Sequence, residues 1–236
     1  MKVICAGLAK TGTKSLAKAL GILGYNVYDY QEHFDFHQKE WLDSFETDRL
    51  PNFKEIYQGV DAVTDVPPAF WFEEIAAAFS EAKVILTVRD SAEVWVKSWK
   101  EHLKLEKDMA FLTKIAFWWN NGLHFGDTFQ NAIYGSSNPE ATALFRVKYR
   151  QHNERVQAVI PAERLLVFNV KQGWKPLCEF LSCDIPSTQF PRANVGHAFV
   201  KERYLRYGAK IKFTIAYIFL SAILLFVGVV IVKFTR

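Results

Sequence analysis

The sequence predicts an α/β protein in which helices cover both faces of a central parallel sheet, giving three layers. Short apolar runs alternate with segments of helical periodicity along most of the chain. The run 83–88 is continuously apolar apart from its first residue and Thr87, which is typical of a strand buried on both faces. The first apolar run, 3–6, leads through a glycine-bearing loop into a helical pattern. Together these observations predict one doubly covered sheet.

The predicted elements can be justified in chain order. Gly24 ends a first helix at 13–23, and a second strand follows at 26–28. Apolar residues share one side of a helix predicted at 37–50. The prolines Pro67 and Pro68 stop a third strand at 60–64. The remaining helices are predicted at 71–79, 92–105, 142–159 and 176–181, and the remaining strands at 83–88 and 165–170.

The segment 107–134 differs from the rest because it is polar and aromatic. Its apolar residues recur at roughly helical spacing and are Met109, Leu112, Ile115, Trp118, Trp119, Phe125 and Phe129. Two interpretations stay open. The stripe belongs to the ordinary core, or it forms a lid or acceptor pocket close to a membrane.

Composition limits the function. With 236 residues, 50% of them hydrophobic, the chain can bury one sizeable core. A net charge of +4 suits an anionic ligand or a membrane surface, and without a long basic run it predicts no nucleic-acid partner. Cys5, Cys178 and Cys183 are an odd number without metal-like partners, so we expect reduced thiols, no metal site and a cytosol-facing compartment.

The C-terminal part predicts a membrane anchor. Residues 213–232 form an uncharged stretch of the length that crosses about 30 Å of hydrocarbon. The preceding linker, 197–212, is basic, which favours a cytosolic position for the domain 1–196. With only 233–236 after it, the segment is expected to be a tail anchor. Which membrane it enters is not specified by the sequence.

The loop between the first strand and the first helix predicts an anion site. Glycines let the backbone approach an anion, and the first amides of the helix point toward it. The loop and helix start add two lysines and three hydroxyls, namely Lys10, Thr11, Thr13, Lys14 and Ser15. The pattern is not a nucleoside-triphosphate P-loop, because Thr13 follows Gly12 and the lysine comes one place late.

Polar residues also follow two other strands. Asp65 follows the third strand, and Arg89 follows the fourth, with Ser98 about two turns into the next helix. In open α/β sheets, ligands bind beyond the carboxyl ends of the strands. A cation at a second strand end therefore suggests a ligand with phosphates at two places.

Three stretches resemble sulfotransferases that use 3′-phosphoadenosine 5′-phosphosulfate. Lys10-Thr11-Gly12-Thr13 resembles their 5′-phosphosulfate loop, and the stretch 84–90 with Trp95, Ser98 and Trp99 resembles their 3′-phosphate segment. The stretch 173–181, with Phe190, Pro191 and Asn194, resembles a subfamily of short chains. The similarity covers about residues 2–195 and implies a P-loop-related sulfotransferase fold.

The resemblance implies a role for each site residue. Lys10 would contact the oxygen that bridges phosphate and sulfate, and Asp65 would remove the proton of a hydroxyl or amine acceptor. The 5′-phosphate would be held by Thr11, Gly12, Thr13, Lys14 and Ser15. Arg89 and Ser98 would hold the 3′-phosphate. An alternative role for Asp65 is to cap the following turn or helix.

Two features depart from the family pattern. Lys14 stands where a small hydroxyl residue is usual, and the interval from Arg89 to Ser98 is one residue longer than the common one. An added residue rotates a helical position by about 100°.

The leading function is a membrane-tethered sulfotransferase with an unidentified small-molecule or lipid-like acceptor. Two alternatives remain open. They are a P-loop kinase or nucleotidase, and an anchored binding protein without turnover.

Overall fold

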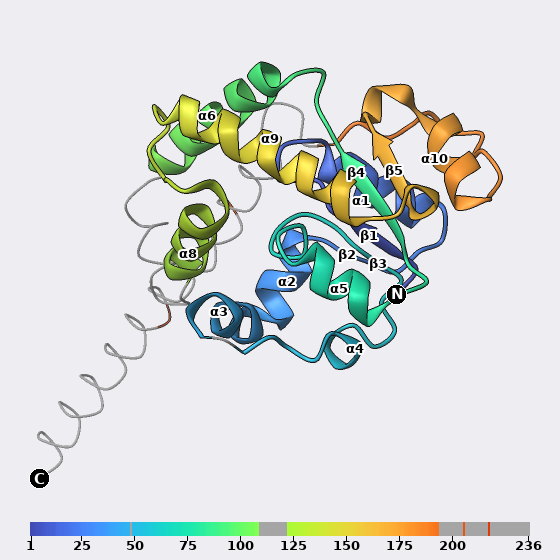
Figure 1. Ribbon diagram of the computed structural model, residues 1–236, viewed down its shortest axis with the longest axis horizontal. Helices are drawn as coiled ribbons and strands as arrows, with labels where there is room; N and C mark the ends of the chain where they lie inside the picture. The colour runs from blue at the N-terminus through green and yellow to red at the C-terminus, as the bar shows by residue number, and fades with distance from the viewer. Residues whose placement is uncertain (48, 109–121, 194–204, 206–216, 218–236) are drawn as a thin grey trace, which may run out of the picture.

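The fold is built on one parallel sheet. The computed structural model describes residues 1–47, 49–108, 122–193, Leu205 and Tyr217. In these residues five strands pair in the order β2-β3-β1-β4-β5, and every pairing is parallel (Figure 1). The strands are β1 (Val3–Cys5), β2 (Val27–Tyr28), β3 (Ala62–Val63), β4 (Lys83–Thr87) and β5 (Leu165–Phe168). The predicted α/β class with a central parallel sheet is confirmed.

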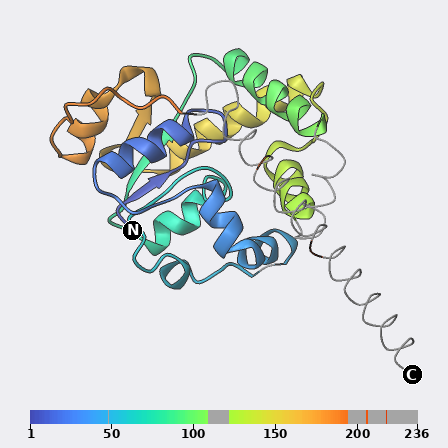
Figure 2. The ribbon, with the colours of Figure 1, turned by 180° about the vertical axis from the view of Figure 1, so that it is seen from behind.

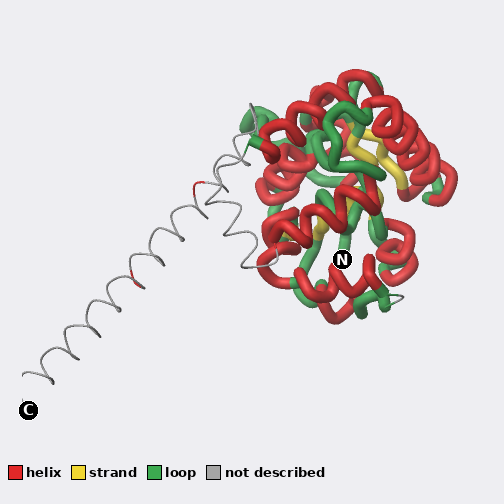
Figure 3. Tube along the Cα trace, turned by 90° about the vertical axis from the view of Figure 1, so that its left-hand side faces the viewer, coloured by secondary structure: helices red, strands yellow, loops and turns green. Residues whose placement is uncertain are grey.

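Helices connect the strands and cover the sheet. The described α-helices are α1 (Thr13–Ile22), α2 (Tyr30–Phe36), α3 (Gln38–Glu46), α4 (Phe53–Ile56), α5 (Phe72–Ala78), α6 (Ala92–Lys107), α8 (Gly122–Tyr134), α9 (Thr142–Val159) and α10 (Trp174–Leu181). Two short 3₁₀ helices, η1 (Ala162–Arg164) and η2 (Val170–Gln172), flank β5. The strands lie inside a shell of helices (Figure 3).

The alternation of side chains along β1 divides the core into two parts. Val3 and Cys5 pack with apolar residues of α1 and α10, whereas Ile4 packs with those of α5, α6 and α9. Figure 1 shows α5 and α9 over one face of the sheet, and Figure 2 shows α1 over the other. All three residues are buried, which explains why the strand is apolar without alternation.

The main differences from the prediction lie around α2 and α3. The sequence predicts one helix at 37–50, but α3 ends at Glu46 and a further helix, α2, precedes it. Asp29 and Glu32 form a capping box at the start of α2, a signal that is present in the sequence. The helix predicted at 142–159 has the same bounds as α9.

Some predictions cannot be compared with this structure. No helix among the described residues is long and apolar enough to cross a membrane. The predicted spanning segment, 213–232, lies outside the described residues apart from Tyr217, and so do 109–121 in the aromatic segment.

Cys5, Cys178 and Cys183 are free thiols.

The close approach of β1 to β4 can be tested at Gly7. A Cβ at this position would lie 1.9 Å from Thr87 Oγ1 and 2.7 Å from the Thr87 backbone nitrogen. The backbone of Thr87 is part of β4 and cannot move without disturbing the sheet. We therefore expect Gly7→Ala to lower the free energy of unfolding by about 3 kcal/mol. Urea unfolding followed by circular dichroism measures this loss.

Gly21→Ala is the matched control. A Cβ at Gly21, inside α1, meets no atom within 4 Å, so the substitution should raise the free energy of unfolding by about 0.5–1 kcal/mol. Equal stability of the two variants would contradict the packing of β1 on β4.

Candidate functional site

The strand order brings the predicted strand-end residues together. β1 lies between β3 and β4, so the loop after β1 is flanked by Asp65 on one side and Arg89 on the other. The chain reverses its direction of travel across the sheet beside β1, and this is where open α/β sheets bind ligands.

The loop after β1 has the conformation of an anion cradle. Lys10 and Gly12 have positive φ angles of 69° and 113°, and α1 begins directly after them at Thr13. The first amides of a helix have no partner within the helix and carry its positive dipole end. Gly12 is required here, because an added Cβ would lie 2.7 Å from a methyl of Val170.

Two side chains from beyond β4 fix this loop. Arg89 Nε donates to the Lys10 carbonyl oxygen at 2.6 Å, and Trp95 Nε1 donates to the Ala9 carbonyl oxygen at 2.9 Å. The terminal nitrogens of Arg89 have no partner among the described residues. Arg89 therefore holds the loop and still offers a guanidinium face to a ligand, although burial lowers its pKa.

The hydroxyls of the loop are used differently from one another. Thr11 is fully buried, donates to the Leu8 carbonyl oxygen at 2.6 Å and contacts Thr87 Oγ1 at 2.5 Å. Its side chain therefore holds the loop and does not face a ligand. Ser15 lines a cavity and accepts a hydrogen bond from the Ala193 amide at 3.0 Å.

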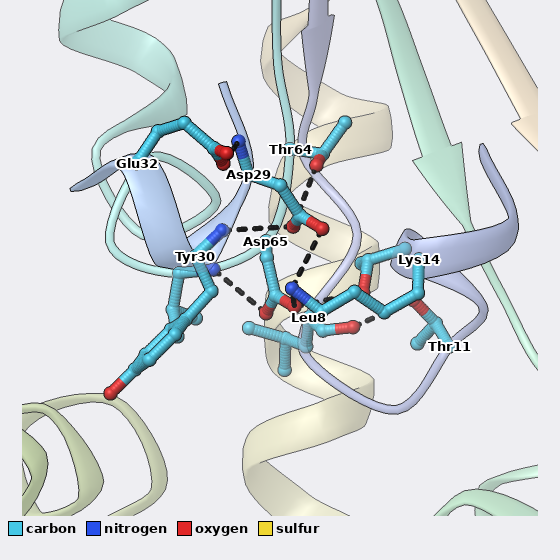
Figure 4. A network of polar contacts seen from close by, with 10 residues as sticks. Leu8, Thr11, Lys14, Asp29, Tyr30, Glu32, Thr64 and Asp65 are labelled. Atoms are coloured by element: carbon cyan, nitrogen blue, oxygen red, sulfur yellow. Dashed lines mark hydrogen bonds and ion pairs between the residues drawn. The ribbon is translucent and has the colours of Figure 1, made fainter. Parts of the chain in front are cut away.

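The ammonium group of Lys14 lies against two carboxylates. Its Nζ lies 2.6 Å from Asp29 Oδ2 and 3.6 Å from Asp65 Oδ2, so the ammonium is shared by two carboxylates (Figure 4). The Tyr30 ring lies 5.8 Å from the same ammonium. The geometry favours an ion pair over the phosphate contact that the resemblance implies for this residue.

Asp65 is a buried carboxylate held at both oxygens. Oδ1 accepts from the Val66 amide at 2.9 Å, and Oδ2 accepts from Thr13 Oγ1 at 3.0 Å. Burial raises the pKa of Asp65, and Lys14 opposes that rise. A raised pKa makes a carboxylate a better base. The contact with Val66 also stabilises the turn, so the two predicted roles of Asp65 are compatible.

A large cavity of about 760 Å³ opens on one side of the loop. Lys10, Ser15, Arg89 and Ser98 all line it. The longer interval between Arg89 and Ser98 therefore does not turn Ser98 away, because α6 begins only at Ala92, after a short connection. The cavity has room for a nucleotide, and four cationic residues and one carboxylate line it: Lys10, Arg89, Lys171, Arg192 and Glu101.

A smaller cavity of about 130 Å³ lies on the other side. Its aromatic wall comprises Tyr30, Trp99, Phe129 and Tyr134. Lys10 and Arg89 line both cavities, whereas Asp65 lines only the smaller one. Burial lowers the pKa of Lys10, and Asp65 opposes that fall. A group transferred between ligands in the two cavities would pass Lys10.

Of the aromatic stripe predicted at 107–134, Phe125 and Phe129 belong to the described residues, and the other five members lie outside them. On α8, Phe125 is fully buried and packs against Phe34 and Tyr30, so it belongs to the core. Phe129 contacts Phe125 and Phe45 and also lines the smaller cavity.

Sequence reasoning missed several residues of this site. Asp29 follows β2 just as Asp65 follows β3, so the same strand-end argument could have found it. His102 and Glu106 are one helical turn apart on α6 and both line the smaller cavity. The distance from His102 Nε2 to Glu106 Oε1 is 3.5 Å. Lys171, in η2, and Arg192, directly after Pro191, also line the larger cavity. Among the described residues, no cluster of three or more His, Cys, Asp or Glu could hold a metal ion.

The fold and this edge of the sheet are those of α/β proteins that hold phosphate-bearing ligands. The family model described as "Sulfotransferase domain" matches residues 2–199, and the chain belongs to this family. The chain is also 32% identical over 213 residues to "Ava biosynthesis cluster protein M" of Aspergillus versicolor. That alignment covers 81% of this chain and 80% of the relative. The family inferred from the three stretches is confirmed, and membership supports a sulfotransferase-like function.

The bond that fixes the loop can be tested at Trp95. We expect Trp95→Phe to leave the buried Ala9 carbonyl without its donor, at a cost of about 1–3 kcal/mol in the free energy of unfolding. Trp99→Phe removes the same atoms from a neighbouring buried indole whose Nε1 has no partner among the described residues. Urea unfolding of both variants isolates the hydrogen bond. Equal losses would show that it contributes nothing.

Proposed function

We propose that this protein is a sulfotransferase that moves the sulfuryl group of 3′-phosphoadenosine 5′-phosphosulfate to a hydroxyl or amine of a small-molecule acceptor. The observation that carries the proposal is the position of Lys10 at the junction of two cavities. The larger is rich in cations, and the smaller is aromatic and contains Asp65. Membership of the sulfotransferase family supports it further.

The nucleotide would occupy the larger cavity. Arg89 and Ser98 would bind the 3′-phosphate, with Arg192 and Lys171 as further cations on the same wall. The 5′-phosphate would lie on the first amides of α1, near Gly12 and Ser15. Cationic side chains and helix-start amides are the groups that bind phosphate oxygens.

The transfer would take place at the junction. The acceptor oxygen or nitrogen attacks sulfur, the bond between sulfur and the bridging oxygen breaks, and the acceptor proton passes to Asp65. The products are the sulfated acceptor and adenosine 3′,5′-bisphosphate. Lys10 stabilises the negative charge that develops on the bridging oxygen.

The acceptor would be an aromatic or apolar small molecule. The smaller cavity presents aromatic faces together with a few polar groups, and such surfaces bind planar ligands with one reactive polar atom. The name of the Aspergillus relative refers to a biosynthesis cluster, which supports a small-molecule acceptor.

The proposal is tested with adenosine 3′,5′-bisphosphate and ATP as separate ligands. We expect the bisphosphate to raise the melting temperature of the wild type, and Arg89→Ala to remove the shift. Arg150→Ala, an exposed arginine on α9, should keep it. Transfer of labelled sulfate to a panel of phenols should fall at least about 100-fold in Lys10→Ala, because one charge-stabilising donor typically contributes that much.

Two outcomes would contradict the proposal. Stabilisation by ATP alone would favour a kinase or nucleotidase. Stabilisation by the bisphosphate without transfer to any acceptor in the panel would favour a binding protein without turnover.

We further propose that residues 213–232 tether the domain to a membrane, with the domain on the cytosolic side. The support is the uncharged sequence of this segment and the five basic residues that precede it: Lys201, Arg203, Arg206, Lys210 and Lys212. An arginine near the middle of a spanning helix costs about 2.5–3.5 kcal/mol of insertion free energy.

The tether predicts a fractionation result. The full chain should stay with membranes after alkaline carbonate extraction, and Leu224→Arg should release a large part of it. Lys210→Ala, outside the apolar segment, is the control. Complete release of the wild type would refute the tether and leave the proposed transferase activity unaffected.

A further inference from the structure

Asp65, on the wall of the smaller cavity, belongs to an ionic cluster whose other two members, Lys14 and Asp29, have no part in the proposed transfer step. Lys14, from the first turn of α1, reaches toward Asp29, which caps α2, and Asp65, which follows β3 (Figure 4). The exposed fractions of the three side chains are 12%, 15% and 8%. One cation thus faces two carboxylates in a place with little water.

The two carboxylates are held in different ways. Asp29 Oδ1 accepts from Thr64 Oγ1 and from the Tyr30 amide, both at 2.9 Å, and its own amide donates to Glu32. Asp29 is therefore fixed by the α2 cap and takes the shorter contact with Lys14. Asp65 takes the longer contact, and its oxygens lie on the cavity wall.

We propose that Lys14 and Asp29 are positioning residues for Asp65: Lys14 holds the Asp65 carboxylate in place and favours the ionised form that accepts the proton of the acceptor, and Asp29 anchors Lys14. This inference rests on the proposed sulfotransferase function. Lys14 offsets the burial of Asp65, and Asp29 limits that effect because it competes for the same ammonium. Together, Lys14 and Asp29 set the pH above which Asp65 is deprotonated and able to accept a proton.

Several other groups face Asp65 from the surrounding elements. They are Lys10 from the loop after β1, Cys5 from β1 and Tyr134 from α8, with Arg89, His102 and Glu106 further along the same cavity wall. The cysteine and tyrosine are neutral at moderate pH, since burial raises the pKa of Cys5 to about 11 and that of Tyr134 well above its ordinary value. Lys14 and Asp29 are the two charged residues of the cluster that can be substituted separately while Asp65 is kept.

The two positioning residues predict shifts in opposite directions. Lys14 lowers the pKa of Asp65 and Asp29 raises it. A base works when deprotonated, so activity should rise with pH through the pKa of Asp65. Lys14→Met should move the midpoint of this rise to higher pH, and Asp29→Asn should move it to lower pH. At pH values below the pKa of Asp65, each pH unit by which a substitution raises this pKa lowers the transfer rate about tenfold.

The experiment measures the titration directly in the full chain. Carbon-13 NMR of protein labelled at the aspartate carboxyl carbons follows Asp65, whose signal is assigned by its loss in Asp65→Asn. The kinetic arm follows transfer from 3′-phosphoadenosine 5′-phosphosulfate to 2-naphthol across the same pH range. Lys14→Arg, which keeps the charge, should titrate nearly as the wild type does.

Matched controls separate this role from general effects of charge. Lys18→Met and Asp35→Asn make the same chemical changes at exposed positions on α1 and α2 and should leave the midpoint in place. Thermal unfolding checks that each variant is folded. Asp29→Asn is isosteric and can still accept from Thr64, so it carries the test if Lys14→Met fails to fold.

The outcomes distinguish this inference from the function on which it rests. Opposite shifts in the two variants support it. An unchanged Asp65 midpoint in both overturns it, as does loss of adenosine 3′,5′-bisphosphate binding in Lys14→Met with no shift, which would make Lys14 a phosphate ligand. Absence of transfer by the wild type would count against the proposed function, while the NMR titration would still decide the role of the pair.

Discussion

The site depends on two hydrogen bonds that hold the loop after β1. Arg89 Nε and Trp95 Nε1 bind the carbonyl oxygens of Lys10 and Ala9, two consecutive residues. A loop that turns through positive φ angles before a helix would otherwise be free to move. These bonds tie it to the residues that follow β4, so the groups beyond β1 and those beyond β4 keep a fixed relation. Gly7, packed against Thr87, makes the same connection through the backbone.

The second constraint is electrostatic. A carboxylate as buried as Asp65 loses its hydration, and a single cation restores part of that loss. Here the cation is shared with Asp29, so compensation is incomplete and burial keeps the pKa of Asp65 above its usual value. A strong pair between Lys14 and Asp65 alone would make a poor base. In the proposed mechanism, the shared ammonium would let Asp65 stay ionised and still be basic enough to accept a proton.

In the proposed function, the two cavities would bind the two ligands of one group transfer, and different elements line them. The larger is lined by loops, α1, α6 and η2, whereas α8 and Tyr30 from α2 line the smaller. Lys10 and Arg89, at the carboxyl edge of the central strands, line both, as does Ala193 from the loop after α10. In the proposed function, the nucleotide would bind at the part of the fold common to α/β proteins that bind phosphates, and helices outside the sheet would select the acceptor.

The sequence by itself determined the sheet, the glycine-lysine loop and the family, because apolar runs, glycines and strand-end charges are local signals. It also predicted that Lys10, Asp65 and Arg89 lie at one edge, since parallel strands end together. The tertiary structure alone decided which way side chains point. Thr11 turns inward to Thr87, Lys14 turns to Asp29, and Ser98 stays on the cavity wall despite the longer interval before it. Such directions follow from strand order and from contacts between residues far apart in the chain, which local patterns do not contain.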